Sequence, residues 1–160
     1  MLTMAFKACS QIGDYDSMLQ LFRNILLNKF VDPEEESKMY TTLTTGLSYS
    51  KRPKEMLKVF KEIVDMGFNP DLRTYNFLLR ALANSNEHSH AMLLYQDMIQ
   101  RNIRPSVKTF HVLMKSVPMS MEFKVIEDLL DEMEHKHGIG FDLLLFELVC
   151  TRCVKQHNYS

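Results

Sequence analysis

The chain has 160 residues, of which 46% are hydrophobic and 24% are charged. This composition is typical of a soluble globular or repeat protein and excludes an intrinsically disordered chain. Because the net charge is -1, no overall basic field attracts nucleic acid or anionic lipid, and any nucleic-acid binding has to rest on local patches.

The first 34 residues are expected to form a helix pair. Leu2, Phe6 and Cys9 mark an incomplete first helix. The second helix carries an apolar stripe with the helical spacing i, i+3, i+4, i+7. Its members are Met18, Leu21, Phe22 and Ile25. Because this repeat pattern begins at once, we expect that a targeting segment has been removed or that the sequence is truncated.

The same unit recurs with a period of about 35 residues. Aromatic residues lie 35, 35 and 36 positions apart, at Tyr40, Tyr75, Phe110 and Phe146. Apolar residues follow the first three aromatics at helical spacing. The period divides the chain into four copies, at about residues 1–34, 37–71, 72–106 and 107–141.

Each later copy has a second apolar stripe at the same offset. Its members are Met56, Val59, Phe60 and Ile63, then Ala91, Leu94, Tyr95 and Met98, then Ile126, Leu129, Leu130 and Met133. A lone helix pair cannot bury both of its stripes, so neighbouring pairs must stack. The sequence therefore predicts an all-α fold, a right-handed α-solenoid of about four helix-turn-helix repeats plus a C-terminal helix.

The connectors between copies carry matching signals for the end of one helix and the start of the next. Gly67 and Asn102 occupy places where a left-handed residue can end a helix, and a proline three residues later prevents its continuation. Asp71 and Ser106 follow these prolines and are expected to be N-caps. The longer connector after the first copy, with its run of three glutamates, is interpreted as a solvated loop.

An extra helix is expected over residues 142–156, and its start is apolar around nearly the whole circumference. The apolar run is far shorter than the ~20 residues of a membrane span, so no membrane insertion is expected. One interpretation is a protein-docking surface, and the other is that the helix packs on the fourth pair. The docking candidates are Phe141, Leu144, Leu145 and Leu148.

The extra helix also contains a C-x2-C-x3-H pattern at Cys150, Cys153 and His157. A zinc site needs a fourth ligand, which His135 or His137 supplies only by folding back, so an ordinary helix without a metal is favoured. Three cysteines form no disulfide framework, which favours a reducing compartment. No catalytic triad, glycine-rich phosphate loop or paired carboxylates stand out, so we expect no enzyme, no cofactor and no small-molecule substrate.

Residues 69–79, Asn-Pro-Asp-Leu-Arg-Thr-Tyr-Asn-Phe-Leu-Leu, resemble the signature of the pentatricopeptide repeat family. Residues 91–98 are similar to that family's second helix, and residues 105–110 restart the signature. Tetratricopeptide repeats share the period but not these motifs. The resemblance implies recognition of single-stranded RNA, one base per repeat, by two side chains.

The side-chain pairs that match the family's base-reading positions are Thr41 with Asp71, Asn76 with Ser106, and His111 with Asp142. The resemblance implies that the Thr–Asp pair favours guanine and the Asn–Ser pair a pyrimidine. A histidine departs from the family pattern, so the third pair predicts no base. The same residues are also explained as helix-face polar groups and helix caps, and both interpretations stay open.

Basic residues stand two positions before the aromatic residue, where the family often has an aliphatic one. They are Lys38, Arg73 and Lys108. We expect all three to contact RNA phosphates.

These patterns predict a non-catalytic RNA-binding adaptor in organelle RNA metabolism or translation. The resemblance places it in a mitochondrion, or alternatively a plastid. The competing hypothesis is a structural subunit of a large ribonucleoprotein such as a mitochondrial ribosome, contacting ribosomal RNA and protein partners.

Overall fold

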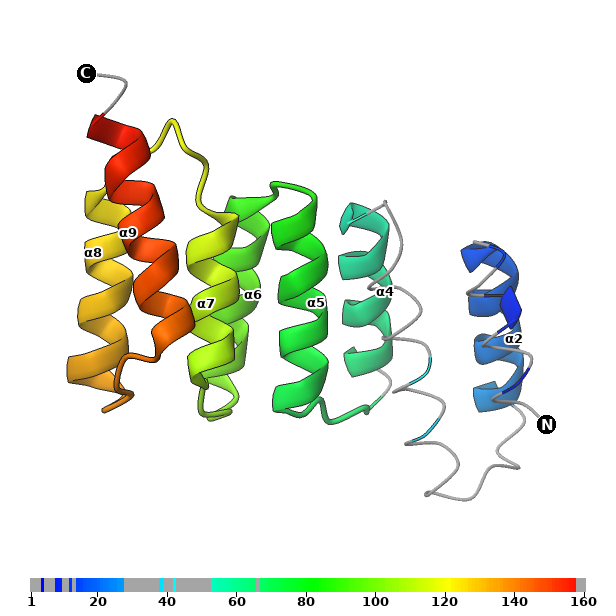
Figure 1. The fold of residues 1–160 in the computed structure, drawn as a ribbon. Helices are drawn as coiled ribbons and strands as arrows, with labels where there is room; N and C mark the ends of the chain where they lie inside the picture. The colour runs from blue at the N-terminus through cyan, green and yellow to red at the C-terminus, as the bar shows by residue number, and fades with distance from the viewer. Residues whose placement is uncertain are drawn as a thin grey trace. The chain divides into compact units, whose positions relative to one another are not determined.

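The computed structural model describes residues 14–27, 53–65 and 67–157, together with the isolated residues Met4, Ala8, Cys9, Ile12, Lys38 and Thr42. The regular structure of this part of the chain is helical, without a strand (Figure 1). None of its helices has the length and apolar character that a membrane crossing requires. The chain forms two compact units, Met1–Ala81 and Leu82–Ser160. The expected first helices of the first two copies, with Thr41, lie outside the described residues apart from isolated positions.

The first unit contains α2 (Tyr15–Leu27), α4 (Pro53–Asp65) and most of α5 (Leu72–Asn84). The apolar stripe predicted for α4 is buried along its whole length. In α2, Phe22 is fully buried, whereas Leu21 of the same predicted stripe is 38% exposed. An ion pair of 2.6 Å between Arg23 Nη2 and Glu62 Oε2 joins α2 to α4.

The repeated aromatic residue of α5 lies in the core of the first unit. The ring of Tyr75 is fully buried and meets the ring of Phe60 of α4 edge to face, with centroids 5.6 Å apart. Such a pair contributes about 0.5 to 1.5 kcal/mol beyond the apolar area it buries. The aromatic residue of the period therefore marks where α5 packs on the preceding helix, α4.

Left-handed residues end the helices as predicted. Gly67 has φ +104°, and its amide donates to Val64 O at 3.0 Å while Phe68 N donates to Ile63 O at 3.1 Å. This pair of bonds is a Schellman motif, which satisfies two carbonyls at the end of α4. Asn102, with φ +58°, ends the helix before it in the same way.

The second unit contains α6 (His88–Gln100), α7 (Val107–Ser116), α8 (Lys124–Asp131), the π-helical turn η1 (Glu132–Lys136) and α9 (Leu143–His157). Helix α7 packs against α6, α8 and α9. The predicted stripe of α6 is buried throughout. In the stripe of α8 and η1 three residues are buried, and Leu130 is half-buried.

Phe110 of α7 lies at the centre of this second core. Its ring is fully buried, 5.8 Å from the ring of Tyr95 of α6 and 5.8 Å from that of His137, which follows η1. The arrangement repeats the Phe60–Tyr75 pair of the first unit, 35 residues further along the chain.

Helix α9 corrects two expectations about its apolar residues. Leu145, expected on the docking surface, is fully buried, whereas Phe146, the fourth aromatic of the period, is 60% exposed. Phe60 and Tyr95 provide rings for the buried aromatics of α5 and α7, but the position 35 residues further on is Leu130, which has no ring. The aromatic at the start of α9 therefore has no ring partner of this kind.

Candidate nucleic-acid interface

Asp71 is an exposed residue that caps α5. Its Oδ1 accepts hydrogen bonds from Thr74 N and from Thr74 Oγ1, both at 2.8 Å. The predicted capping role is confirmed, and it occupies only one carboxylate oxygen. In the described structure Oδ2 has no hydrogen bond, so Asp71 retains acceptor capacity for a second partner.

Ser106 caps α7 through a reciprocal arrangement with Thr109. The backbone N of Ser106 donates to Thr109 Oγ1 at 3.0 Å, and the two hydroxyl oxygens lie 3.3 Å apart. Ser106 is half-buried and Thr109 fully buried. Capping is therefore this serine's first role, and base contact remains a prediction.

Asn76 and His111 are half-buried and occupy equivalent places on α5 and α7, five residues after Asp71 and Ser106. Asp142, predicted to act with His111, is exposed and caps α9, because its Oδ1 accepts from Leu145 N at 2.8 Å. Asn76 belongs to the first unit and Ser106 to the second, so the structure does not define how this pair is arranged.

The charged residues of α5 and α7 are all cations. Neither helix contains an aspartate or a glutamate. The predicted phosphate contacts Arg73 and Lys108 are exposed, and so are Arg80 and Lys115 two turns further on. Lys38 is exposed as well. The guanidinium carbon of Arg80 lies 5.7 Å from the ring centroid of Phe77.

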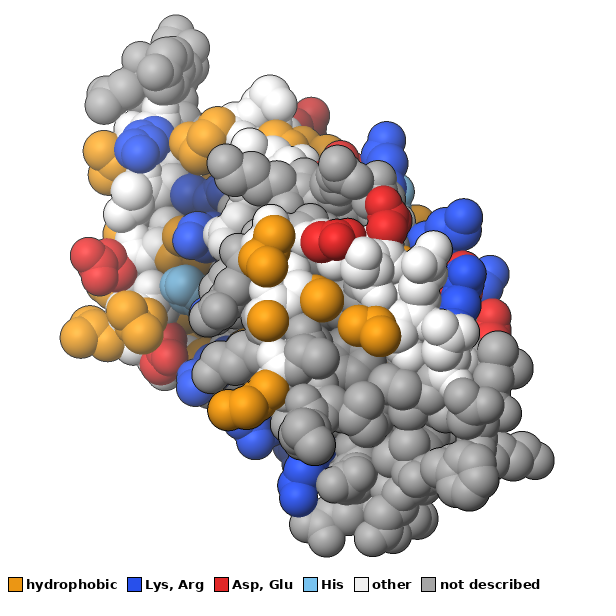
Figure 2. Space-filling view, turned by 90° about the vertical axis from the view of Figure 1, so that its right-hand side faces the viewer, with side chains coloured by type: hydrophobic (Ala, Val, Ile, Leu, Met, Phe, Trp, Pro, Cys, Tyr) orange, Lys and Arg blue, Asp and Glu red, His pale blue; other side chains and the backbone are white. Residues whose placement is uncertain are grey.

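Three cations elsewhere in the second unit, Arg101, Lys124 and Lys136, pair with carboxylates. Arg101 Nε lies 3.1 Å from an oxygen of Asp97, and Lys124 Nζ lies 3.6 Å from one of Asp128. In the view of Figure 2, blue basic and red acidic side chains both lie among orange hydrophobic ones, as the net charge of -1 suggests. What distinguishes α5 and α7 is therefore that they carry cations and contain no carboxylate of their own.

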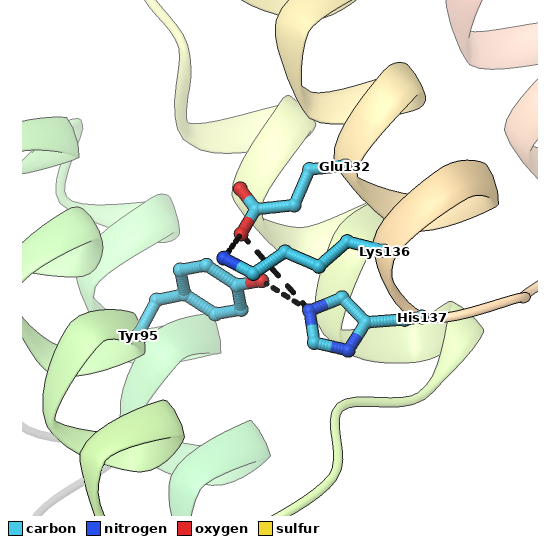
Figure 3. Close-up of polar contacts among 4 residues, drawn as sticks. All are labelled: Tyr95, Glu132, Lys136 and His137. Carbon is cyan, nitrogen blue, oxygen red and sulfur yellow. Dashed lines mark hydrogen bonds and ion pairs between the residues drawn. The ribbon is translucent and has the colours of Figure 1, made fainter.

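A polar cluster between α6 and η1 brings together Tyr95, Glu132, Lys136 and His137 (Figure 3). Tyr95 Oη lies 3.1 Å from His137 Nε2, and Lys136 Nζ lies 2.7 Å from Glu132 Oε1. Burial, together with the nearby Glu132 carboxylate, raises the pKa of Tyr95 well above its usual value. Burial lowers the pKa of His137, although Glu132 opposes that shift.

These shifts favour the neutral phenol of Tyr95 and the neutral imidazole of His137. Arg104 fixes the same segment, because its Nη2 donates to His137 O at 3.0 Å. A tyrosine with a raised pKa stays protonated near neutral pH and gives up its proton poorly, and the contacts tie η1 to α6. We interpret the cluster as a structural contact.

A second polar group joins α6, α7 and α9. Ser116 Oγ donates to Leu113 O at 2.6 Å and lies 2.9 Å from His88 Nδ1, so the imidazole N–H donates to the serine oxygen. Burial, with Arg152 nearby, lowers the pKa of His88. Arg152 Nη2 in turn donates to Lys115 O at 3.3 Å, which anchors α9 to the end of α7.

Cys150 and Cys153 are free thiols on α9. Across the described residues, no group of three or more potential ligands is placed to hold a metal ion.

Comparison with known proteins adds a family and a fold. A model of the PPR repeat family matches residues 36–84 and 74–117, together more than half of the chain. No curated protein sequence matches significantly. The crystal structure of the pentatricopeptide repeat protein PPR10 from maize matches 99% of the chain, with a TM-score of 0.78 and 18% identity.

PPR10 in complex with an 18-nt psaJ RNA element matches 99% of the chain with a TM-score of 0.43 and 20% identity, and the match covers 29% of that chain. The match to maize PPR10 covers only 24% of that protein, so the chain spans about a quarter of its length. The likeness confirms the predicted all-α helical-repeat fold of the α-solenoid class.

Proposed function

The chain belongs to the pentatricopeptide repeat family, and on this premise we propose that it is a non-catalytic adaptor that binds single-stranded RNA. The observation that carries the proposal is the charge of α5 and α7, which contain cations and no carboxylate. Exposed basic groups without acidic neighbours attract phosphates and release their counterions on binding. Asn76 and His111 add polar groups next to these cations, suited to contact base edges.

Base contacts alone give weak binding. Three bases at about 1 to 3 kcal/mol each yield a gross gain of about 3 to 9 kcal/mol. Ordering the RNA and the side chains costs part of this, which leaves an affinity weaker than about micromolar. We therefore propose that phosphate contacts, a longer RNA or a protein partner supply the remainder.

Base preference is proposed to come from the side chains near the helix starts. Asp71 keeps one carboxylate oxygen beyond its cap, which can accept from a purine edge. The pairing of Thr41 with Asp71 then favours guanine, and that of Asn76 with Ser106 a pyrimidine. Asn76→Ala is expected to change the ranking of bases while the salt dependence stays the same.

The test is fluorescence anisotropy with labelled single-stranded RNA over a range of salt concentrations. Replacing Lys38, Arg73 and Lys108 together by Ala is expected to weaken binding to all sequences and to flatten the salt dependence. Lys124→Ala is the matched control, because this exposed lysine already pairs with Asp128. Equal binding by the wild type and the triple variant would remove these cations from the mechanism.

From family membership we propose that the protein acts in organelle RNA metabolism or translation. The proposed organelle is a mitochondrion, and the alternative is a plastid. Cell fractionation with antibodies to the native protein tests it. Recovery outside both organelles contradicts it.

A second candidate function is a structural subunit of a large ribonucleoprotein, such as a mitochondrial ribosome. The observation that favours it is apolar surface near and on α9, where Phe141 is 49% exposed, Leu144 63% and Phe146 60%. Such patches are typical of protein contacts. Sedimentation of the native protein distinguishes the two functions: constant stoichiometry in one large particle supports the subunit, and a light RNA-bound species supports the adaptor.

A further inference from the structure

We propose that Arg80 and Lys115 bind RNA phosphates, so that α5 and α7 each hold the RNA backbone with two cations that flank the base-contacting residue. The proposal rests on the proposed function and deepens it. The two cations proposed to bind phosphates lie on the same helix in each case.

Arg80 and Lys115 occupy equivalent positions along the repeat. Arg80 follows Arg73 by seven residues, and Lys115 follows Lys108 by seven. Seven residues are close to two helical turns, so the two cations of a helix share one face, about 10 Å apart along its axis. The repeat period of 35 residues relates Arg80 to Lys115, so both helices carry the same pattern.

A polar residue lies between the two cations of each helix. Asn76 lies three residues after Arg73 and four before Arg80, which places it on the same helix face. His111 stands in the same relation to Lys108 and Lys115. Each helix therefore presents a cation, a polar side chain and a second cation in line.

The cations of α5 and α7 have no carboxylate partner among the described residues. Within residues 67–157, which the structure describes, Arg73, Arg80, Lys108 and Lys115 form no ion pair. Arg101, at the end of α6, and Lys124, at the start of α8, do. A cation kept without a partner on a helix that has no acid is suited to an external anion.

The helix dipole explains at most one of the two residues. Lys115 lies in the last turn of α7, where a cation stabilises the negative helix end, but α5 has no basic residue in its last turn. Arg80 instead lies over Phe77, which holds the guanidinium in place and leaves its edge N–H groups for a phosphate. In α9 the positions equivalent to Lys108 and Lys115, two before and five after the aromatic residue, are Leu144 and Thr151, so α9 is not expected to contact phosphates in this way.

The test compares the wild type with R80Q/K115Q, because glutamine removes the charge while it keeps part of the apolar stem and a polar end. Labelled oligouridylate and oligoadenylate of equal length are titrated by anisotropy at several salt concentrations. Loss of two contacts to single-stranded RNA should lower the slope of log affinity against log salt by about 1.4. Between about 50 and 200 mM salt, the wild type should therefore lose about sevenfold more affinity than the variant.

Further measurements make the result specific. The ratio of affinities for the two oligonucleotides should not change, and R101Q/K124Q should keep the wild-type slope, because it removes cations that are already paired. R80K/K115R should also keep the slope, since it preserves both charges. The single variants R80Q and K115Q should each lower the slope by about 0.7, which keeps the test valid if the double variant does not fold.

The outcomes separate this inference from the proposed function. Salt-dependent binding by the wild type, with the same slope in folded R80Q/K115Q, overturns the role of Arg80 and Lys115 and leaves the RNA-binding proposal standing. If the wild type binds neither oligonucleotide at low salt, the proposed function itself fails.

Discussion

Replacing Leu145 by alanine should release α9, whereas the same replacement of its neighbour Leu144 should have little effect. Leu145 is 0% exposed and Leu144 is 63% exposed, although they are adjacent and chemically identical. Truncating a fully buried leucine costs about 2 to 5 kcal/mol, from lost apolar transfer and from the cavity that remains. An exposed surface change is usually within about 0.5 kcal/mol.

The assay should detect local opening, because helical-repeat proteins are stabilised by contacts between neighbours and can open one helix at a time. Cys153 is half-buried on α9 and reports this opening through its reaction with a thiol reagent. Cys9 and Cys150 are first replaced by serine. A loss of at least about 2 kcal/mol should speed the reaction of Cys153 about 30-fold in Leu145→Ala.

Global unfolding in urea, followed by the helical circular dichroism signal, complements the thiol measurement. Leu145→Ala should lower the first transition, while Leu144→Ala should follow the parent protein. Equal thiol reactivity and equal urea curves for the two variants would refute the conclusion that Leu145 anchors α9 to the core.

Three further predictions follow from other contacts. Asp71→Ala removes both bonds to Thr74 and should destabilise α5 by about 0.5 to 2 kcal/mol, measured by urea unfolding. Changing the exposed residues Leu143 and Leu144 together to lysine should raise solubility, measured by light scattering, and leave the melting temperature nearly unchanged; a sharp fall in melting temperature contradicts the exposed position. Burial lowers the pKa of His88 below 6.5, so its contribution to stability is present above pH 6.5 and is lost as the pH falls through the lowered pKa. The urea midpoint of the wild type should therefore fall between about pH 7 and 5. In His88→Gln the midpoint should depend less on pH over this range.

Much of the fold was predictable because its signals are local. The stripes of α4 and α6 are set by helical periodicity, and every predicted member of these two stripes is buried. Gly67 and Asn102 end helices because their own backbone conformation permits it. Asp71 caps α5 through a residue three positions away.

The candidate site was predictable only in part. The resemblance to the pentatricopeptide repeat family pointed to Arg73, Asn76, Lys108 and His111, and the structure leaves the two cations exposed. The repeat period relates Arg80 to Lys115, but their significance depends on whether a carboxylate lies nearby. That is a property of the folded surface, since an acid from any neighbouring helix can neutralise them.

The sequence by itself determined that this protein is an all-α helical repeat, where its copies recur and which residues cap its helices, since bonds and stripes of this kind span only a few positions. Tertiary structure alone decided that Leu145 is buried while Phe146 is exposed, that a π-helical turn precedes His137, and that Tyr95 meets this histidine. The physical reason is that adjacent residues on a helix point about 100° apart. A pattern of apolar residues around a whole helix leaves open which direction faces the core, and only the packing of α9 on α7 fixes that direction.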